Sequence, residues 1–423
     1  MIYPGPLTPE QRRESQKNYE RFGIINGLSY MCLGETVIIL FAVRLNASNA
    51  LIAVLGSMIF FSYLLLPLGK MVTAHVGAAR SQAIFWTLRN MAALVVAASS
   101  VVAYAGYPEL ALLEVLVGAC VFYGFRAAGA VMIQPLLGDI ATRDERSELV
   151  GRSNALFYIG SVAALLAIWG VFQVFDTIWA LTGIIVVGAC LGVTSTRYIR
   201  RIDETSALRE SARRPMWSQM HRAWTFPALR RLIGACFMIN LAIIMMVPVS
   251  MLAVKRGYLV SDTQALLFSL VQFLSAAVFS FTSGRLVKRF GARTMIKAGY
   301  WALLSIAVLW AAAPRQLSYC YAPLIFIPAG GAGVVAGNAV LHYFLAAMPI
   351  RIRVAASMLM AVITGVGPGV AGMLLSGGIF KGIARIGENW EPLSTFKVYF
   401  LLALALLALA ARVVYRLPPE PEK

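Results

Sequence analysis

Long apolar runs dominate this sequence and limit what the chain can fold into. A helix that crosses the hydrocarbon layer of a membrane needs about 20 predominantly apolar residues. With 59% hydrophobic and only 13% charged residues, the chain resembles neither a soluble globular protein nor a disordered one. The pattern predicts an all-α membrane protein with twelve transmembrane helices, at residues 22–45, 50–69, 84–105, 110–137, 154–175, 177–196, 232–254, 264–284, 295–313, 319–346, 354–380 and 396–416.

The formal net charge of +18 arises from 37 lysine and arginine residues against 19 acidic ones. On a soluble protein this excess would indicate nucleic acid binding, but in a membrane protein cations gather on cytoplasmic loops. Arg126 lies inside a predicted span, and 29 cations fall at the predicted inner ends. The other seven lie at the outer ends: Arg44, Lys255, Arg256, Arg315, Lys381, Arg385 and Lys397. Both termini are therefore expected in the cytoplasm, and no nucleic acid partner is expected.

The longest polar gap, residues 197–231, carries nine arginines and separates six spans from six. It could be a patch for an acidic partner, but we interpret it as a cytoplasmic linker that contacts anionic lipid headgroups. The predicted organisation is a cytoplasmic N-terminal tail at 1–21, a six-helix bundle at 22–196, the basic linker at 197–231, a second bundle at 232–416 and a cytoplasmic tail at 417–423. Short loops favour a bacterial inner membrane.

An internal repeat relates the two halves. The stretch from Leu51 to Gly69 has the same length as the stretch from Leu266 to Gly284, and both open on an Ala-Leu pair. The second span thus corresponds to the eighth at an offset of 215 residues. Together with the division into six and six, this correspondence indicates duplication.

Two loops carry a recognisable pattern of glycines and charged residues. The spacing of Gly284, Leu286, Arg289, Gly291 and Arg293 resembles a loop motif of the major facilitator superfamily, with Lys288 where the family has an acid. The equivalent loop after the second span has Thr73 at that acidic position. Between spans four and five, Asp139, Arg146 and Gly151 are similar to a second family turn. The resemblance implies two six-helix bundles around a central cavity that opens alternately to each side. Spans 1, 4, 7 and 10 would line that cavity, with substrate near the bilayer midplane.

Ionisable residues deep in a membrane are costly and are therefore candidates for function. Glu35 and Arg126 each lie thirteen residues from the inner end of a cavity-lining span, about 20 Å deep at ~1.5 Å per residue. We predict that the two charges meet. Either they form a switch opened by a proton or by an anionic substrate, or they form a permanent ion pair between spans one and four. Tyr123 beside Arg126 would help to wall the substrate site.

Further candidates follow from polar residues within spans. Tyr158 is the next candidate substrate contact, ahead of Asn154, which lies near the membrane edge. Asp139 is expected to tether the inner loop through Arg89. Glu109 and Glu114 are interpreted as outer headgroup residues, with an outer gate as the alternative. In the second half the candidates are Asn240, Ser250, Gln272, Asn338, His342 and Thr364, of which Asn240, Gln272 and Asn338 are predicted substrate contacts.

Motifs for other chemistries are absent from the sequence. It has no GxxxxGK[ST] phosphate loop, no CxxC pair and no Ser-His-Asp grouping, so no cofactor, metal site or enzymatic activity is expected. The leading hypothesis is a monomeric secondary transporter for a small organic solute with an anionic group, coupled to protons. The first alternative is a broad-specificity exporter of amphipathic or lipid-like compounds, with Met245, Met246, Met251, Met358 and Met360 lining an adaptable cavity. A lipid scramblase and a non-transporting receptor are alternatives of another class.

Overall fold

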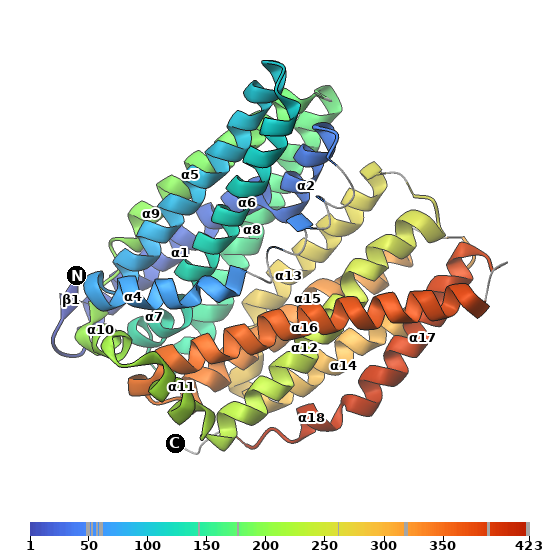
Figure 1. Cartoon of the computed structure of the whole chain (residues 1–423). Coiled ribbons are helices and arrows are strands. Elements are labelled where there is room, and N and C mark those ends of the chain that lie inside the picture. Colours follow the sequence, from blue (N-terminus) through green and yellow to red (C-terminus); the bar gives the residue numbers. More distant parts are fainter. Residues whose placement is uncertain are drawn as a thin grey trace. The chain divides into compact units, whose positions relative to one another are not determined.

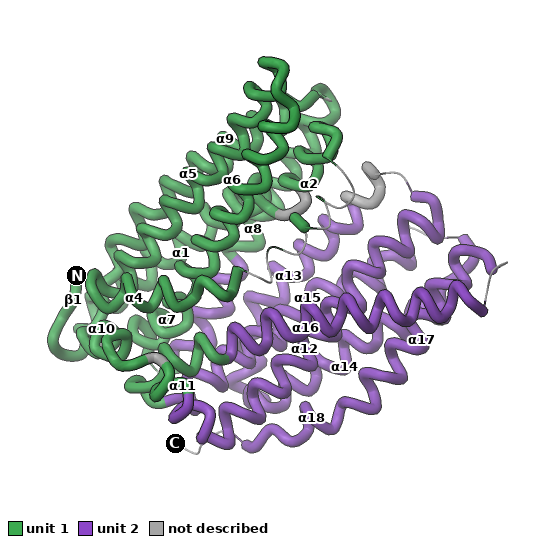
Figure 2. Tube along the Cα trace, in the orientation of Figure 1, with its two compact units in different colours: residues 1–144, 156–220, 349–359 green, residues 145–155, 221–348, 360–423 purple. Residues whose placement is uncertain are grey.

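The computed structural model of the chain is helical almost throughout (Figure 1). It describes residues 1–47, 62–142, 144–175, 177–260, 262–316, 320–386 and 390–419, together with Leu51, Val54, Leu55 and Met58; the side chains of 35, 36, 216 and 262–266 are outside this description. The helices form two compact units, drawn in different colours in Figure 2.

Unit 1 comprises residues 1–144, 156–220 and 349–359. Its elements are β1 (Ile2–Tyr3), α1 (Pro9–Leu33), α2 (Glu35–Arg44), η1 (Ser62–Leu65), α4 (Leu66–Val76), α5 (Ala78–Tyr104), α6 (Pro108–Ala130), α7 (Ile133–Ile140), most of α8 (Arg146–Val174), α9 (Ile178–Ile199), β2 (Glu204–Thr205), α10 (Ser206–Arg213) and the start of α11 (Met216–Trp224).

Unit 2 comprises residues 145–155, 221–348 and 360–423. It holds α12 (Pro227–Leu252), the π-helical turn η2 (Ala253–Gly257), α13 (Asp262–Phe290), α14 (Ala292–Ala311), α15 (Ala322–Ala347), most of α16 (Ile350–Ile386), α17 (Pro392–Ala410) and α18 (Arg412–Tyr415). The first turns of α8 pack with unit 2 and the first turns of α16 with unit 1, so the predicted bundle limits, 22–196 and 232–416, are not the limits of the compact units.

Eleven helical segments among the described residues are long and apolar enough to cross a membrane, which makes the chain an integral membrane protein. They correspond to eleven of the twelve predicted spans. Of the remaining prediction, at 50–69, the structure describes Leu51, Val54, Leu55, Met58 and residues 62–69, which form η1 and the start of α4. The predicted span at 22–45 differs in form, because Gly34 interrupts it between α1 and α2.

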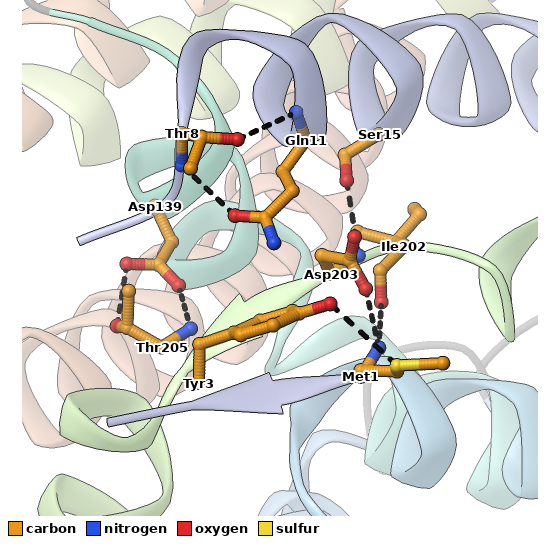
Figure 3. Close-up of polar contacts among 9 residues, drawn as sticks. All are labelled: Met1, Tyr3, Thr8, Gln11, Ser15, Asp139, Ile202, Asp203 and Thr205. Atoms are coloured by element: carbon orange, nitrogen blue, oxygen red, sulfur yellow. Dashed lines mark hydrogen bonds and ion pairs between the residues drawn. The ribbon is translucent and has the colours of Figure 1, made fainter. Parts of the chain in front are cut away.

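The predicted N-terminal tail is structured rather than loose. Residues 9–21 are the first turns of α1, which begins with a capping box in which Thr8 and Gln11 bond each other's backbone amides. Ahead of it, β1 pairs in parallel with β2 of the linker, Ile2 opposite Glu204. We call this pairing the β1–β2 clasp; Figure 3 shows the polar contacts around it.

Glu204 fixes the clasp to the start of α5. Its side chain is 2% exposed, and its Oε2 accepts a hydrogen bond from the Ala78 amide at 2.7 Å. Just before Ala78, Gly77 turns the chain with a φ of +93°, a conformation that favours glycine. Burial raises the pKa of Glu204 to about 7, against the opposing effect of the Ala78 and Ala79 amides.

Helices in unit 1 approach one another at glycines. A Cβ at Gly27 would lie 2.0 Å from the Phe157 carbonyl oxygen, and one at Gly160 would lie 2.2 Å from the Ile24 carbonyl oxygen. The crossing of α1 and α8 therefore brings backbone against backbone. In a bilayer, where lipid tails are as apolar as the side chains, such close packing is a main source of helix association.

We expect Gly160→Ala to destabilise this crossing, because the new methyl group would overlap the backbone of α1; overpacking of this kind typically costs about 1–3 kcal/mol. The matched control is Gly170→Ala in the same helix, where an added Cβ meets no atom within 4 Å. Thermal unfolding in detergent should show a lower midpoint for the first variant and an unchanged or higher one for the second. Equal midpoints would contradict the packing argument.

Glu204→Gln should alter the pH dependence of stability. The folded pKa of about 7 lies above the ordinary value of 4.5, so the folded state binds more protons between these values and loses stability as the pH rises through them. Removing the carboxylate should therefore stabilise the protein at pH 8 relative to pH 5, by up to about 3 kcal/mol. Unfolding midpoints at both pH values test this, with the exposed Glu210→Gln as a control that should show no such difference.

Candidate functional site

Two helices of unit 1 are interrupted within their apolar segments. After α1, Gly34 takes an extended conformation (φ −64°, ψ 163°) and α2 begins at the next residue. After α6, the chain turns at 131–132 before α7 begins. At membrane depth an interrupted helix exposes backbone polar groups, which is tolerated only where protein buries them or a water-filled cavity is lined.

Arg126 and Tyr30 lie one turn before these interruptions. Arg126 donates a hydrogen bond to the Tyr30 side chain, and its Cζ is 5.2 Å from the centre of the Tyr30 ring. Arg126 is four residues before the end of α6, and Tyr30 is four residues before Gly34. The tyrosine thus contributes both a hydrogen bond and a cation–π contact to a deep cation.

Three further tyrosines surround this pair. Tyr63 from η1 and Tyr123 from α6 lie near Arg126, and Tyr158 from α8 lies near Tyr30. Tyr123 is 1% exposed, whereas the other members keep part of their surface accessible. We call the set the tyrosine–arginine cluster: Tyr30, Tyr63, Tyr123, Arg126 and Tyr158.

A second buried arginine stands beside the cluster. Arg89 of α5 is 1% exposed and interacts electrostatically with Arg126. Its Cζ lies 4.7 Å from the Trp86 ring centre and 5.3 Å from that of Phe122, and it donates to Asn90 Oδ1 at 3.3 Å. Sequence reasoning placed Arg89 near the start of a span as a partner of Asp139; it lies three turns into α5 instead.

Glu35, the predicted partner of Arg126, is the first residue of α2. Its side chain is outside the described residues, so the predicted Glu35–Arg126 contact stays a prediction. The backbone nevertheless places Glu35 directly after the interruption at Gly34, five residues beyond Tyr30.

Asp139 binds the linker. Its two carboxylate oxygens accept bonds from Thr205, from the amide at 2.6 Å and from the hydroxyl at 2.8 Å (Figure 3). Asp139 also interacts electrostatically with Arg353 and Arg12. Within unit 1, Asp139 therefore tethers the linker through Thr205. The predicted partner of Asp139 was Arg89, and Thr205 takes that place.

Asn338 is occupied by protein partners. Its Nδ2 donates to Ser283 Oγ at 2.7 Å, and its Oδ1 accepts from Asn154 Nδ2 at 2.5 Å, all within unit 2. Asn338 is 5% exposed. Both ends of its amide are engaged in joining α15 to α13 and to the start of α8.

The remaining candidates of unit 2 also have local contacts. Asn240 donates to the Thr364 carbonyl at 2.7 Å, and Ser250 accepts from Trp310 at 2.8 Å. Helices α13 and α15 touch at Gln272 and Gly330, because a Cβ added at Gly330 would lie 2.0 Å from the backbone oxygen of Gln272. Of these, Asn240 and Gln272 keep accessible surface and remain available for a solute.

The predicted loop at 284–293 is a single-residue turn. Gly284 and Arg289 belong to α13, only Gly291 (φ +78°) lies between the helices, and Arg293 is in the first turn of α14. Arg289 packs on the Phe290 ring at 5.2 Å. Gly291 corresponds to Gly77, which joins α4 to α5 in the same way.

Contacts with α8 fix the end of α13. A Cβ at Gly284 would lie 2.6 Å from the Ser147 carbonyl oxygen, and Lys288 pairs with Glu148 at 3.1 Å. Arg146 donates to the Leu345 carbonyl of α15 at 3.2 Å. Gly284, Lys288 and Arg146 of the two signature-like loops are thus all engaged in contacts within unit 2.

The remaining predictions concern the methionines, Glu114 and metal binding. Met245, Met246, Met358 and Met360 are at most 3% exposed, so these four fill the interior of the units rather than line an adaptable cavity. Glu114, six residues into α6, has one carboxylate oxygen buried without a hydrogen-bond partner among the described residues. Within the same residues, no three His, Cys, Asp or Glu side chains are grouped to hold a metal ion.

Comparisons with solved structures identify the fold. The chain is similar to the proton:xylose symporter XylE of the major facilitator superfamily, bound to 6-bromo-6-deoxy-D-glucose, with 14% identity over 98% of this chain and 97% of that one and a TM-score of 0.70. It is also similar to a bacterial homologue of the iron transporter ferroportin in the outward-facing state with soaked iron (11% identity, 96% and 98% coverage, TM-score 0.64).

A third similar structure is the E.coli fucose:proton symporter FucP, with 11% identity over 96% of this chain and 98% of that one and a TM-score of 0.63. No family model and no curated protein sequence matches the chain. The chain therefore has the major facilitator fold, which confirms the resemblance drawn from its loops at the level of the fold.

The contacts of Asn338 predict a structural role. Asn338→Ala should lower the unfolding midpoint, because Asn154 and Ser283 would lose their partner; an unsatisfied buried polar group costs about 1–3 kcal/mol. The KM for a transported solute should stay unchanged. Gln272→Ala is the comparison in unit 2, because its side chain keeps accessible surface. A KM increase in Asn338→Ala with unaltered stability would instead favour direct substrate contact.

Proposed function

We propose that the chain is a secondary transporter that moves a small organic anion across the membrane by alternating access, acting as a monomer. The observation that carries this proposal is the tyrosine–arginine cluster, in which Arg126 is held far from either end of its apolar segment. The major facilitator fold, shared with sugar symporters and a bacterial homologue of an iron transporter, supports transport as the activity.

The anionic character of the solute follows from the cost of burying cations. An arginine at membrane depth loses its hydration, and a tyrosine ring offsets only part of that loss. A carboxylate or phosphate would accept two parallel hydrogen bonds from the guanidinium and neutralise its charge. Arg89, close enough to act on Arg126 electrostatically, raises the local positive potential further.

The tyrosines suit an organic rather than an inorganic anion. Tyr30, Tyr63 and Tyr158 keep accessible surface, so their rings can contact carbon atoms while their hydroxyl groups donate or accept hydrogen bonds. The interruptions of α1 and α6 lie nearby, and discontinuous helices contribute backbone contacts at other membrane-protein binding sites. Asn240 and Gln272 are the proposed contacts from unit 2.

Proton coupling is assigned to Glu35. XylE and FucP are named as proton symporters, which supports a proton as the coupling ion here. Glu35 starts α2 beside the interruption, in the same region of the sequence as Tyr30. Protonation of a carboxylate there would remove one charge from the surroundings of Arg126 and so change the affinity for an anion.

The proposal is tested by transport into proteoliposomes under an imposed pH gradient, with organic anions, neutral sugars and organic cations as solutes. We expect uptake of an anion and a loss of roughly a hundredfold in kcat/KM for Arg126→Gln, equivalent to about 3 kcal/mol for a bidentate charged contact. Arg80→Gln, an exposed position of α5, removes the same charge and should leave uptake unchanged. Uptake of sugars alone would refute the anionic substrate.

Glu35→Gln separates coupling from substrate binding in the same vesicles. This variant should exchange the solute across the membrane without a gradient, yet fail to accumulate it when a pH gradient is imposed. The matched control is Glu109→Gln at the start of α6. Undiminished accumulation by Glu35→Gln would remove Glu35 from the coupling mechanism while leaving the role of Arg126 intact.

A further inference from the structure

A pocket of about 700 Å³ lies in unit 1 between α4 and the linker. Helices α4 and α10 pack against each other (Figure 1), and the segment 212–217 completes the wall. Four basic side chains, one exposed methionine and one tryptophan characterise its lining: Lys70, Met71, His75, Arg213, Arg214 and Trp217. None of the nine described residues that line the pocket is acidic.

Lys70 is a buried cation without a carboxylate partner among the described residues. It is 6% exposed, and its Nζ donates to the backbone carbonyl of Arg214. Burial lowers the pKa of Lys70, because the ammonium has lost water without gaining a negative charge. An anion in the pocket would restore that charge balance.

Arg213 is positioned for the same ligand. Its Nε donates to the Ala74 carbonyl of α4 at 3.1 Å, which orients the guanidinium at the pocket. The neighbouring Arg214 and His75 also line it. Arginine forks match the oxygens of a phosphate, and a lysine contributes a point charge.

The apolar lining distinguishes a lipid from a free anion. Met71 is 63% exposed and Trp217 is 76% exposed, although both are apolar and stand beside the cations. Tryptophan favours the level of the lipid headgroups, where one end of the ring is wet and the other is in hydrocarbon. Basic pockets beside membrane helices on the cytoplasmic side bind anionic headgroups, and the linker is predicted to face the cytoplasm.

We propose that this pocket is a binding site for one anionic phospholipid, whose phosphate contacts Lys70, Arg213 and Arg214 and whose acyl chains lie against Met71 and Trp217. The site joins α4 to the linker. It is independent of the proposed solute, because none of its residues belongs to the tyrosine–arginine cluster.

Native mass spectrometry of the full chain in detergent, titrated with phosphatidylglycerol or phosphatidylcholine, tests the site. We expect one phosphatidylglycerol to bind more tightly than phosphatidylcholine. The double variant Lys70→Met, Arg214→Gln should weaken phosphatidylglycerol binding by about thirtyfold, at roughly fivefold for each cation. The control Arg222→Gln, Arg230→Gln removes two linker charges outside the pocket and should change it less than about twofold.

Equal losses in the two double variants, or equal affinities for the two lipids, would overturn the proposal. Displacement of phosphatidylglycerol by inorganic phosphate at matching concentration would overturn it in favour of a free-anion site. Should the double variant unfold, Arg214→Gln alone decides, because that side chain is partly exposed. It should lose about fivefold in phosphatidylglycerol affinity while keeping the wild-type unfolding midpoint, and unchanged affinity would refute the site.

Discussion

The absence of water in the bilayer core governs this structure, because every backbone amide and carbonyl there must find a partner within the protein. The chain satisfies this requirement with helices and then joins them through backbone contacts at glycines such as Gly27, Gly160 and Gly330. Against that background, an interruption of a helix is informative. The interruptions after α1 and α6 both fall one turn beyond a member of the tyrosine–arginine cluster.

Charged side chains in the bilayer core also need partners within the protein. Arg89 lies against Trp86 and Phe122, and Arg126 lies against Tyr30. Aromatic faces compensate a buried charge without neutralising it, at about 2 kcal/mol or more when desolvated. Under the proposed function, an anion that reached these two guanidinium groups would bind more strongly than it would bind either group in water.

Much of the fold could be predicted from the sequence, because the requirement for apolar side chains acts on each stretch of about 20 residues separately. The site could be predicted only in part. The sequence predicts Arg126 and Tyr123 together, since they are neighbours on a cavity-lining span, and it predicts Tyr158 as a further substrate contact. Tyr30 and Tyr63 were not predicted, because no local pattern connects residues from α1, η1, α6 and α8, and only packing brings them together.

The contacts of the linker, like those of the tyrosine–arginine cluster, could not be predicted from local sequence patterns. Its nine arginines predicted a cytoplasmic location, but not that Glu204 would close on α5 or that Thr205 would bind Asp139. Both contacts join residues more than 60 positions apart, and both start from β2 of the β1–β2 clasp. A basic composition describes the field around a segment; the few acidic and hydroxyl groups within it decide where the segment is attached.

Lys288 illustrates how a departure from a family pattern can be compensated elsewhere in the chain. The loop motif resembled here has an acid at this position, whereas this chain has a cation that pairs with Glu148 at 3.1 Å. Lys288 is in the last turn of α13 and Glu148 in the first turn of α8, so each charge sits at the helix end whose dipole favours it.

Both of these side chains are about half exposed, so the pair itself contributes at most about 1 kcal/mol. The close backbone contact of Gly284 with Ser147 provides the packing, and the charge pair orients the two helix ends. In this chain the electrostatic contact between the end of α13 and the start of α8 is therefore made by a lysine on α13 and an acid on α8.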